Sequence, residues 1–281
     1  MHIHVKLRSQ KGIHTEKVRI GKRTCLLLTP DKRNGPGPAV VWIHGGGYIL
    51  GLKEMVHMSR AVDLVKEFGA VVLSPGYRLA LMSPYPAAVQ DCYEALIWLK
   101  EHAAKYGAQE NLILVGGESA GGGLTAAVCM MARDHDVHID LQLPLYPMLD
   151  DRPTASSEDN HGRIWNTRRN RFAWKMYLRR VRREKVPVYA APARQTDFQG
   201  LPPCYTFVGD GEPFRDEALG YVQALREAGI EAECDVYHTD IHAFDMLCPE
   251  LEISQRARER FLEKVKAFLE EREAAGKEKE K

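Results

Sequence analysis

Short apolar runs alternate along this chain with longer segments of helical periodicity. Six runs have the length and composition of strands buried on both faces: residues 39–43, 70–73, 112–115, 141–145, 204–208 and 234–237. Apolar residues with helical spacing occur near residues 54–68, 87–104, 119–133, 214–228 and 254–274. This alternation predicts an α/β fold with a mostly parallel central sheet and helices on both faces.

The first 30 residues follow a different pattern. Val5–Leu7 and Cys25–Leu28 flank polar turns, which predicts an antiparallel hairpin ahead of the parallel strands.

The stretch from about residue 150 to 201 also interrupts the alternation, because it is rich in Arg, Asn, Pro and Trp and too long for an ordinary connection. Within it, apolar residues at i, i+3, i+4 and i+7 predict an amphipathic helix that faces the rest of the protein: Trp174, Tyr177, Leu178 and Val181. We therefore expect residues 151–200 to form an inserted helical lid, and residues 1–150 and 201–281 to form the core.

Composition narrows the class of partner. The chain has 281 residues, 44% hydrophobic and 27% charged, as expected of one or two globular domains. Its 39 Lys and Arg nearly balance 38 Asp and Glu, so overall charge favours neither nucleic acid nor an anionic membrane. The basic residues between Arg168 and Lys185 are interpreted as a solvated or ion-paired face, with attraction of anionic esters or of a polyanion as the alternative.

The sequence contains no clear pattern for membrane insertion, secretion or metal binding. No window reaches the 18 or more apolar residues of a membrane span, and Met1–Lys6 contains no signal-peptide core, so we expect a cytoplasmic protein. The six cysteines show no paired short spacing, which favours buried reduced thiols over a zinc site or a redox pair. We expect no metal.

Gly117–Gly121 reads Gly-Glu-Ser-Ala-Gly, follows the apolar run at 112–115 and opens an alanine-rich helical segment. This is the Gly-x-Ser-x-Gly nucleophile elbow in its strand–turn–helix context. The glycines leave room for a sharp turn that projects the hydroxyl from the sheet edge, so Ser119 is the candidate nucleophile.

His44-Gly45-Gly46-Gly47 follows the predicted strand at 39–43. Successive glycines leave backbone N–H groups unobstructed, and such groups stabilise the oxyanion that forms when a carbonyl is attacked. In a parallel sheet this loop lies beside the elbow, which predicts an oxyanion hole here.

A serine hydroxyl needs a base, and the base needs a carboxylate to orient it. The elbow predicts the chain order serine, acid, histidine. Of the histidines beyond the nucleophile helix, only His238 and His242 follow the late strands. His238 ends the last strand, whereas His242 lies in the loop after it and is the candidate base.

Four acidic residues follow the strand at 204–208: Asp210, Glu212, Asp216 and Glu217. Asp216 and Glu217 fall in the first turn of the next helix, where acidic side chains interact favourably with the helix dipole, so we expect structural roles for them. Spacing alone leaves Asp210 and Glu212 both able to reach an imidazole.

Jointly, these segments resemble the hormone-sensitive-lipase-like branch of the α/β-hydrolase esterases, also called bacterial family IV. The resemblance extends over nearly the whole chain from about Val18. It rests on the segments at 44–48, 76–80, 85–88 with Asp91, 117–122, 213–217 and 242–244. It implies an α/β-hydrolase fold and a serine hydrolase that needs no cofactor.

The resemblance also assigns roles. In that family the acid stands immediately before the proline of the Pro-x-Arg-Asp-Glu segment, which implies Glu212, with Asp210 as the alternative. It further implies that the amides of Gly46, Gly47 and Ala120 form the oxyanion hole.

By the same resemblance, His44 braces the glycine loop and Glu118 lies behind the elbow. The chain departs from the family where Leu81-Met82 replaces a Pro-Glu pair and where Ala243 replaces a glycine after the histidine. It also starts almost at the first predicted strand, without the family's helical cap, so we expect a more open pocket.

The resulting prediction is a carboxylesterase that hydrolyses short- to medium-chain esters through an acyl-enzyme, with a small-molecule ester as its partner. The sequence itself carries no signal for oligomeric state, although members of the family often form homodimers. An amidase or deacetylase would use the same triad. A non-catalytic small-molecule receptor on this fold is the alternative from another class, and the presence of His242 argues against it.

Overall fold

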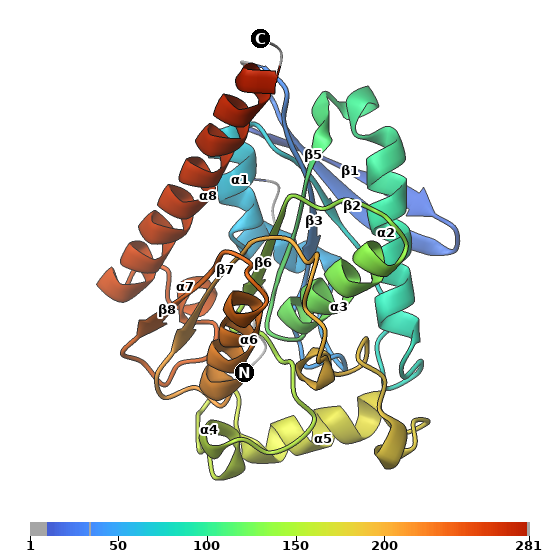
Figure 1. Ribbon diagram of the computed structural model, residues 1–281, viewed down its shortest axis with the longest axis vertical. Helices are drawn as coiled ribbons and strands as arrows, with labels where there is room; N and C mark the ends of the chain where they lie inside the picture. The colour runs from blue at the N-terminus through green and yellow to red at the C-terminus, as the bar shows by residue number, and fades with distance from the viewer. Residues whose placement is uncertain (1–9, 34, 280–281) are drawn as a thin grey trace. The chain divides into compact units, whose positions relative to one another are not determined.

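The computed structural model describes residues 10–33 and 35–279, and in this part of the chain eight strands form one sheet in the order β1-β2-β4-β3-β5-β6-β7-β8 (Figure 1). The strands are β1 (Ile13–Ile20), β2 (Arg23–Pro30), β3 (Gly37–Ile43), β4 (Val71–Ser74), β5 (Ala108–Glu118), β6 (Leu141–Leu145), β7 (Cys204–Gly209) and β8 (Ala232–Tyr237). Among these strands, β2 alone runs in the opposite direction to the others. The mostly parallel sheet expected from the sequence is confirmed.

An antiparallel hairpin precedes the parallel strands, as expected, and its first strand is β1. It pairs β1 with β2, from Ile13 opposite Pro30 to Ile20 opposite Arg23. The segment Val5–Leu7 lies outside the described residues.

Each of the six predicted apolar runs lies in one of the strands β3 to β8. All seven residues of β3 are buried, as are all those of β4, β6 and β7, which explains why these segments lack polar alternation. Because the strands are parallel, their carboxyl ends meet at one sheet edge, where the loops after β3, β5, β7 and β8 converge.

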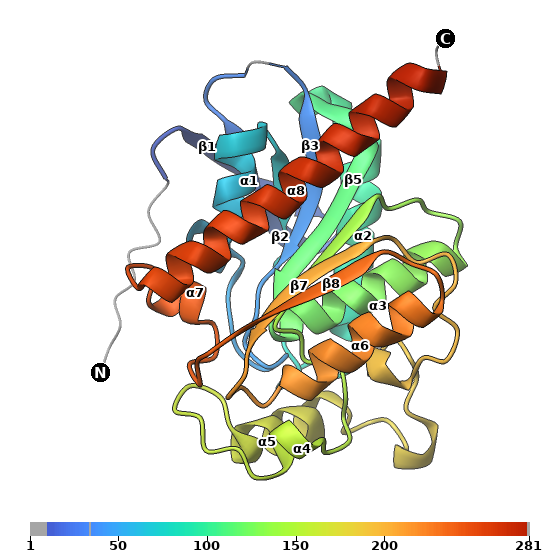
Figure 2. The same ribbon diagram turned by 60° about the vertical axis from the view of Figure 1, so that its left-hand side comes forward.

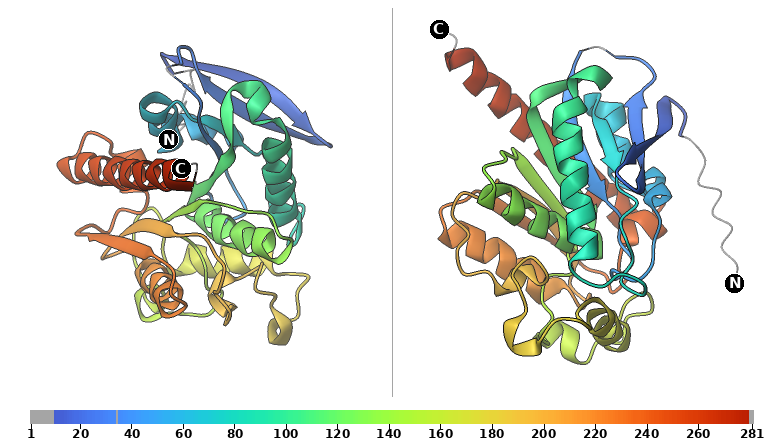
Figure 3. Two further views of the ribbon diagram at one scale, coloured as in Figure 1. Left: turned by 45° about the horizontal axis from the view of Figure 1, so that its top comes forward. Right: turned by 90° about the vertical axis from the view of Figure 1, so that its right-hand side faces the viewer.

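Among the described residues, four helices connect the other strands between β3 and β8: α1 (Ala61–Phe68), α2 (Ala87–His102), α3 (Ala120–Asp134) and α6 (Arg215–Glu227). The 3₁₀ turns η1 (Lys53–Met58) and η2 (Ala104–Tyr106) lie in the same connections. Figure 3 shows α1 on one face of the sheet and α2, α3 and α6 on the other. The single helix predicted near 54–68 was wrong. The chain is extended at Ser59, whose hydroxyl donates to the Val56 carbonyl at 2.9 Å, and this break separates η1 from α1.

The connection between β6 and β7 contains α4 (Ala155–Glu158), α5 (Thr167–Tyr177) and the 3₁₀ turns η3 (Arg183–Lys185) and η4 (Pro192–Arg194). Figure 2 shows α4 and α5 at the carboxyl ends of the parallel strands. Trp174 and Tyr177 are buried on the inner face of α5, as predicted, and Tyr177 stacks on Tyr48 with ring centroids 4.0 Å apart. The helix ends at Tyr177, so the predicted continuation to Val181 was wrong.

The chain divides into two compact units, the second of which begins at Phe244. This second unit holds α7 (Phe244–Leu247) and α8 (Glu252–Lys279), and the Ser254 hydroxyl donates to the Phe244 carbonyl at 3.1 Å. Across the described residues, no helix combines the length and hydrophobicity that crossing a membrane requires. All six cysteines are free thiols.

Candidate active site

Ser119 occupies a strained turn between β5 and α3. Its backbone has φ +57° and ψ −118°, in a region that non-glycine residues rarely adopt. The turn is fixed on both sides, because the Ser119 amide donates to the Leu145 carbonyl at 2.9 Å and the Ser119 carbonyl accepts from the Met148 amide at 3.0 Å. A Cβ at Gly121 would lie 2.0 Å from the Ile43 carbonyl oxygen, which explains the glycine there.

His242 joins the elbow to the acidic loop. Its Nε2 lies 2.9 Å from the Ser119 Oγ, and its Nδ1 is hydrogen bonded to Glu212 Oε2. The other carboxylate oxygen, Glu212 Oε1, accepts from the Gly209 amide at 2.8 Å. The three side chains are buried, Glu212 completely. With the Nδ1 proton held by Glu212, Nε2 is free to accept the serine proton.

Aromatic rings enclose the imidazole. Tyr146 and Phe214 each present a ring centroid 5.2 Å from that of His242 in an edge-on arrangement, and Trp165 lies at 6.4 Å. These three residues were not assigned to the site from the sequence: Phe214 lies in the segment at 213–217 but was given no role, and no motif connects Tyr146 or Trp165 to the catalytic residues. They shield the hydrogen bonds of His242 from water, which strengthens those bonds.

Asp210, the alternative acid, faces elsewhere. Its Oδ2 lies 2.6 Å from Nδ1 of His238, and its Oδ1 accepts from the Thr239 amide at 3.0 Å. The hydrogen bond with the fully exposed His238 side chain lowers the pKa of Asp210 and raises that of His238. The structure therefore brings Glu212, and not Asp210, to the imidazole of His242.

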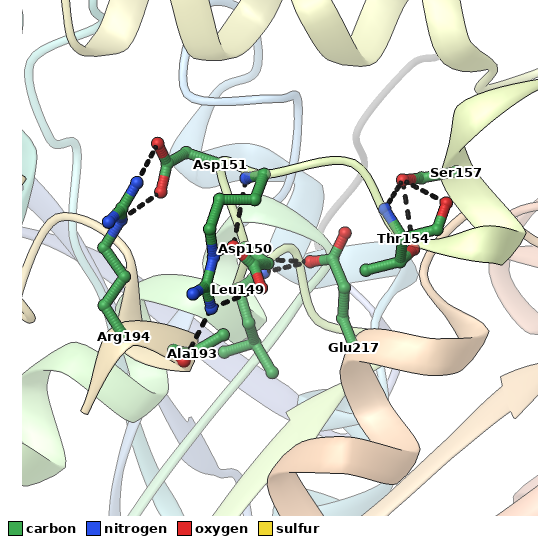
Figure 4. A network of polar contacts seen from close by, with 9 residues as sticks. Leu149, Asp150, Asp151, Thr154, Ser157, Ala193, Arg194 and Glu217 are labelled. Atoms are coloured by element: carbon green, nitrogen blue, oxygen red, sulfur yellow. Dashed lines mark hydrogen bonds and ion pairs between the residues drawn. The ribbon is translucent and has the colours of Figure 1, made fainter. Parts of the chain in front are cut away.

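Asp216 and Glu217 contact the chain around α4 instead of His242. Asp216 Oδ2 accepts from the Ser156 amide at 2.7 Å. Glu217 Oε2 accepts from the amides of Leu149 and Asp150 at 2.6 and 2.8 Å (Figure 4). Burial raises the pKa of Glu217. These contacts agree with the structural roles expected for both residues.

The glycine loop lies against the elbow. A Cβ at Gly45 would lie 3.3 Å from the Ser119 Cβ, so the two segments touch. Gly46 and Gly47 have φ of +114° and +60°, and a Cβ at Gly47 would lie 2.2 Å from the Trp165 ring. Among backbone acceptors outside regular helices and strands in the described residues, none takes a hydrogen bond from the amides of Gly46, Gly47 or Ala120. These N–H groups can therefore bind a ligand oxygen.

His44 and Glu118 support this arrangement from behind. His44 Nδ1 donates to the Gly45 carbonyl at 2.8 Å, and its ring stacks on Tyr77 with centroids 4.2 Å apart. Glu118 Oε1 accepts from the Trp42 indole N–H at 2.7 Å. His44 thus contacts the glycine loop itself, and Glu118 contacts β3. Within the described ranges, no group of three or more His, Cys, Asp or Glu side chains is placed to bind a metal ion.

Burial lowers the pKa of His44 from 6.5 to about 4. A histidine that resists protonation when folded destabilises the protein at acidic pH, because the unfolded chain takes up the proton first. We expect the free energy of unfolding to decrease as pH falls from about 6.5 to 4, with a contribution from His44 of about 3 kcal/mol at pH 4. In His44→Asn the amide can still donate to Gly45 but does not titrate. Denaturant unfolding between pH 4 and 7 measures the free energy of unfolding, which should depend less steeply on pH in this variant than in the wild type. Equal slopes would contradict a lowered pKa for His44.

A serine in a strand–turn–helix elbow, with an imidazole and a buried carboxylate beside it at the carboxyl edge of a parallel sheet, is typical of α/β hydrolases. The profile of the α/β hydrolase fold family matches residues 40–246. The chain belongs to this family, in its hormone-sensitive-lipase-like branch.

Other proteins are similar to this chain in sequence or in structure. The chain is 31% identical over 218 residues to the esterase LipI of Mycobacterium tuberculosis, covering 76% of this chain and 67% of LipI. It is 34% identical over 218 residues to the carboxylic ester hydrolase LipN of the same species, covering 75% of this chain and 58% of LipN. A bacterial heroin esterase structure superposes with a TM-score of 0.86 at 33% identity, covering 92% of this chain and 85% of that one.

Proposed function

We propose that this protein hydrolyses carboxylic esters by acyl transfer to Ser119, with His242 as general base and Glu212 as the acid that orients it. One observation carries the proposal: a single imidazole is hydrogen bonded to the Ser119 hydroxyl at 2.9 Å through Nε2 and to Glu212 through Nδ1. Its relatives, named as esterases, support the same chemistry.

In the first half of the reaction, the Ser119 oxygen attacks the ester carbonyl while His242 Nε2 takes the hydroxyl proton. The carboxylate of Glu212, hydrogen bonded to Nδ1, stabilises the imidazolium that forms. The carbonyl oxygen becomes an oxyanion that accepts hydrogen bonds from the amides of Gly46, Gly47 and Ala120. The imidazolium then protonates the departing alcohol and leaves an acyl-serine.

In the second half, water takes the place of the alcohol. His242 removes a proton from the water, which attacks the acyl carbonyl, and the same amides receive the second oxyanion. Collapse of this intermediate releases the carboxylic acid and returns the proton to Ser119. The cycle uses side chains and backbone amides of this chain and requires no cofactor.

The surroundings of Ser119 favour short to medium acyl groups. The Trp165 ring lies against Gly47 and near His242, so a chain bound at the oxyanion hole must pass beside it. Residues 151–200 supply Trp165 and α5, which gives this connection the role of a lid. Pocket size rather than charge then sets which esters react fastest.

Replacing Trp165 by Ala removes the ring over Gly47 and enlarges the pocket. We expect the ratio of kcat/KM for an octanoate ester to that for an acetate ester to rise by about tenfold, the size of effect that one or two methylenes have in an apolar pocket. A p-nitrophenyl ester series measures this ratio. Trp98→Ala is a control, because its ring stacks on His102 and not on the site. An unchanged ratio in Trp165→Ala would show that Trp165 does not contact the acyl chain of the substrate.

Covalent labelling tests the proposal as a whole. An organophosphonate should modify Ser119 stoichiometrically, identified by peptide mapping, because His242 makes this serine nucleophilic. A non-catalytic receptor would leave it unmodified. Matched esters and anilides then separate an esterase from an amidase, and we expect the anilides to react far more slowly.

A further inference from the structure

A cleft with a volume of about 710 Å³ opens within the connection between β6 and β7. One side is formed by α5 and the turn after it, and the other by Asp151–Pro153, Ser157, Val186 and Arg194. Neither Ser119 nor His242 lines it, so it is separate from the catalytic centre.

Three cations from α5 and the turn after it line the cleft at intervals of four residues: Arg171, Lys175 and Arg179. None of them forms an ion pair with a carboxylate in the part of the chain described. Arg179 donates to the carbonyls of Ala80 and Leu81 at 2.6 and 3.1 Å, and Arg171 donates to a carbonyl at 3.3 Å. Like charges spaced four residues apart repel each other, so this cluster gains stability from a bound anion.

The facing wall cannot supply that anion. Arg152 makes two hydrogen bonds to the Asp150 carboxylate at 2.8 and 2.9 Å, and Arg194 makes two to Asp151 at 2.6 and 2.9 Å (Figure 4). Both carboxylates are therefore already neutralised by bidentate partners on their own side. Arg171, Lys175 and Arg179 therefore have no carboxylate partner on this wall of the cleft.

The rest of the lining is apolar. Trp174, Leu178, Val181 and Val186 contribute to the cleft between its charged positions. These four side chains give the cleft an apolar surface that the hydrocarbon part of a ligand can cover.

We propose that this cleft is a second ligand site that binds an amphipathic carboxylate. The carboxylate group lies between Arg171, Lys175 and Arg179, and the hydrocarbon part packs against Trp174 and Leu178. A neutral molecule of the same shape would leave the three cations unpaired, so charge gives the site its selectivity.

Octanoate is the probe, with octanamide as its neutral counterpart, and isothermal titration calorimetry measures both. We expect octanoate to bind the wild-type protein at least about tenfold more tightly than octanamide, and more weakly as salt rises. The double variant Arg171→Gln/Lys175→Gln should raise the Kd of octanoate by about tenfold, since two partly exposed ion pairs are lost. The Kd of octanamide should stay the same.

The matched control is Arg168→Gln/Arg180→Gln, which removes two exposed cations that do not line the cleft. Its octanoate Kd should change by less than about twofold. Equal weakening in both double variants would show attraction by overall charge and overturn the proposal.

Octanoate also belongs to the class of acid that ester hydrolysis releases, so the catalytic centre must be blocked. Protein labelled at Ser119 by an organophosphonate should bind octanoate as the unlabelled protein does. Loss of binding on labelling would assign the ligand to the catalytic centre and overturn the proposal. If Ser119 resists labelling, the esterase assignment fails, while the comparison of the two double variants still tests the cleft.

Discussion

Replacing Ser119 by Ala lowers kcat for ester hydrolysis by at least about 10⁴-fold, because the variant cannot form the acyl-enzyme. The amides of Gly46, Gly47 and Ala120 remain, so a small residual rate from direct attack by water on bound ester is expected. Steady-state hydrolysis of p-nitrophenyl acetate measures the loss, and the burst of nitrophenol seen with the wild type at high enzyme concentration should disappear.

Ser74→Ala is the matched control. Ser74 is also a fully buried serine, and its hydroxyl donates to the Lys53 carbonyl at 3.0 Å. This variant should lose about 1 kcal/mol of unfolding free energy but keep kcat within about threefold of wild type. If Ser119→Ala kept more than about one part in a thousand of the activity with an unchanged unfolding midpoint, Ser119 would not be the nucleophile.

Much of the architecture could be predicted from the sequence because buried parallel strands leave a strong local signal. Each strand from β3 to β8 contains one of the apolar runs, and the elbow glycines are required by contacts that any sequence with this turn must make. At Gly121, for example, a side chain would collide with the Ile43 carbonyl. Such a requirement is visible in the sequence because only one residue type meets it.

Element boundaries that depend on tertiary contacts could not be predicted. The apolar pattern at 54–68 continues across Ser59, yet the chain is extended there and two shorter helical elements result. In the connection between β6 and β7, the spacing from Trp174 to Val181 is helical, but α5 stops at Tyr177, whose carbonyl accepts from the Tyr85 amide at 2.9 Å. In both places a non-local or side-chain hydrogen bond replaces the next helical one.

Residues that reach the site from the connection between β6 and β7 could not be identified from the sequence either. Trp165 touches Gly47, more than a hundred residues away, and no motif connects them. Ala243 shows the limit of family patterns: it has φ +58°, a conformation suited to the glycine that the family usually has there, so the substitution is more than an added methyl group. Its strain lies beside the base and is apparent only from the backbone geometry.

Glu212→Gln and Asp210→Asn should differ by about three orders of magnitude in their effect on kcat/KM, although the two acids are only two residues apart. Both oxygens of Glu212 act as acceptors, one for the Gly209 amide and one for His242 Nδ1. A glutamine has one acceptor oxygen, so its NH₂ group must face one of these two donors. If it faces His242, the imidazole takes the wrong tautomer, and in either orientation the charge that stabilises the imidazolium is lost.

We therefore expect Glu212→Gln to lower kcat/KM by about 10³- to 10⁴-fold. In Asp210→Asn the affected partners are the Thr239 amide and the exposed His238, neither of which contacts Ser119, so kcat/KM should fall by less than about threefold. Denaturant unfolding of both variants separates a lost catalytic contact from a lost fold, because a folded Glu212→Gln protein with low activity requires a chemical cause. A larger loss in Asp210→Asn would transfer the role of the acid to Asp210 and would mean that the loop after β7 rearranges when substrate binds.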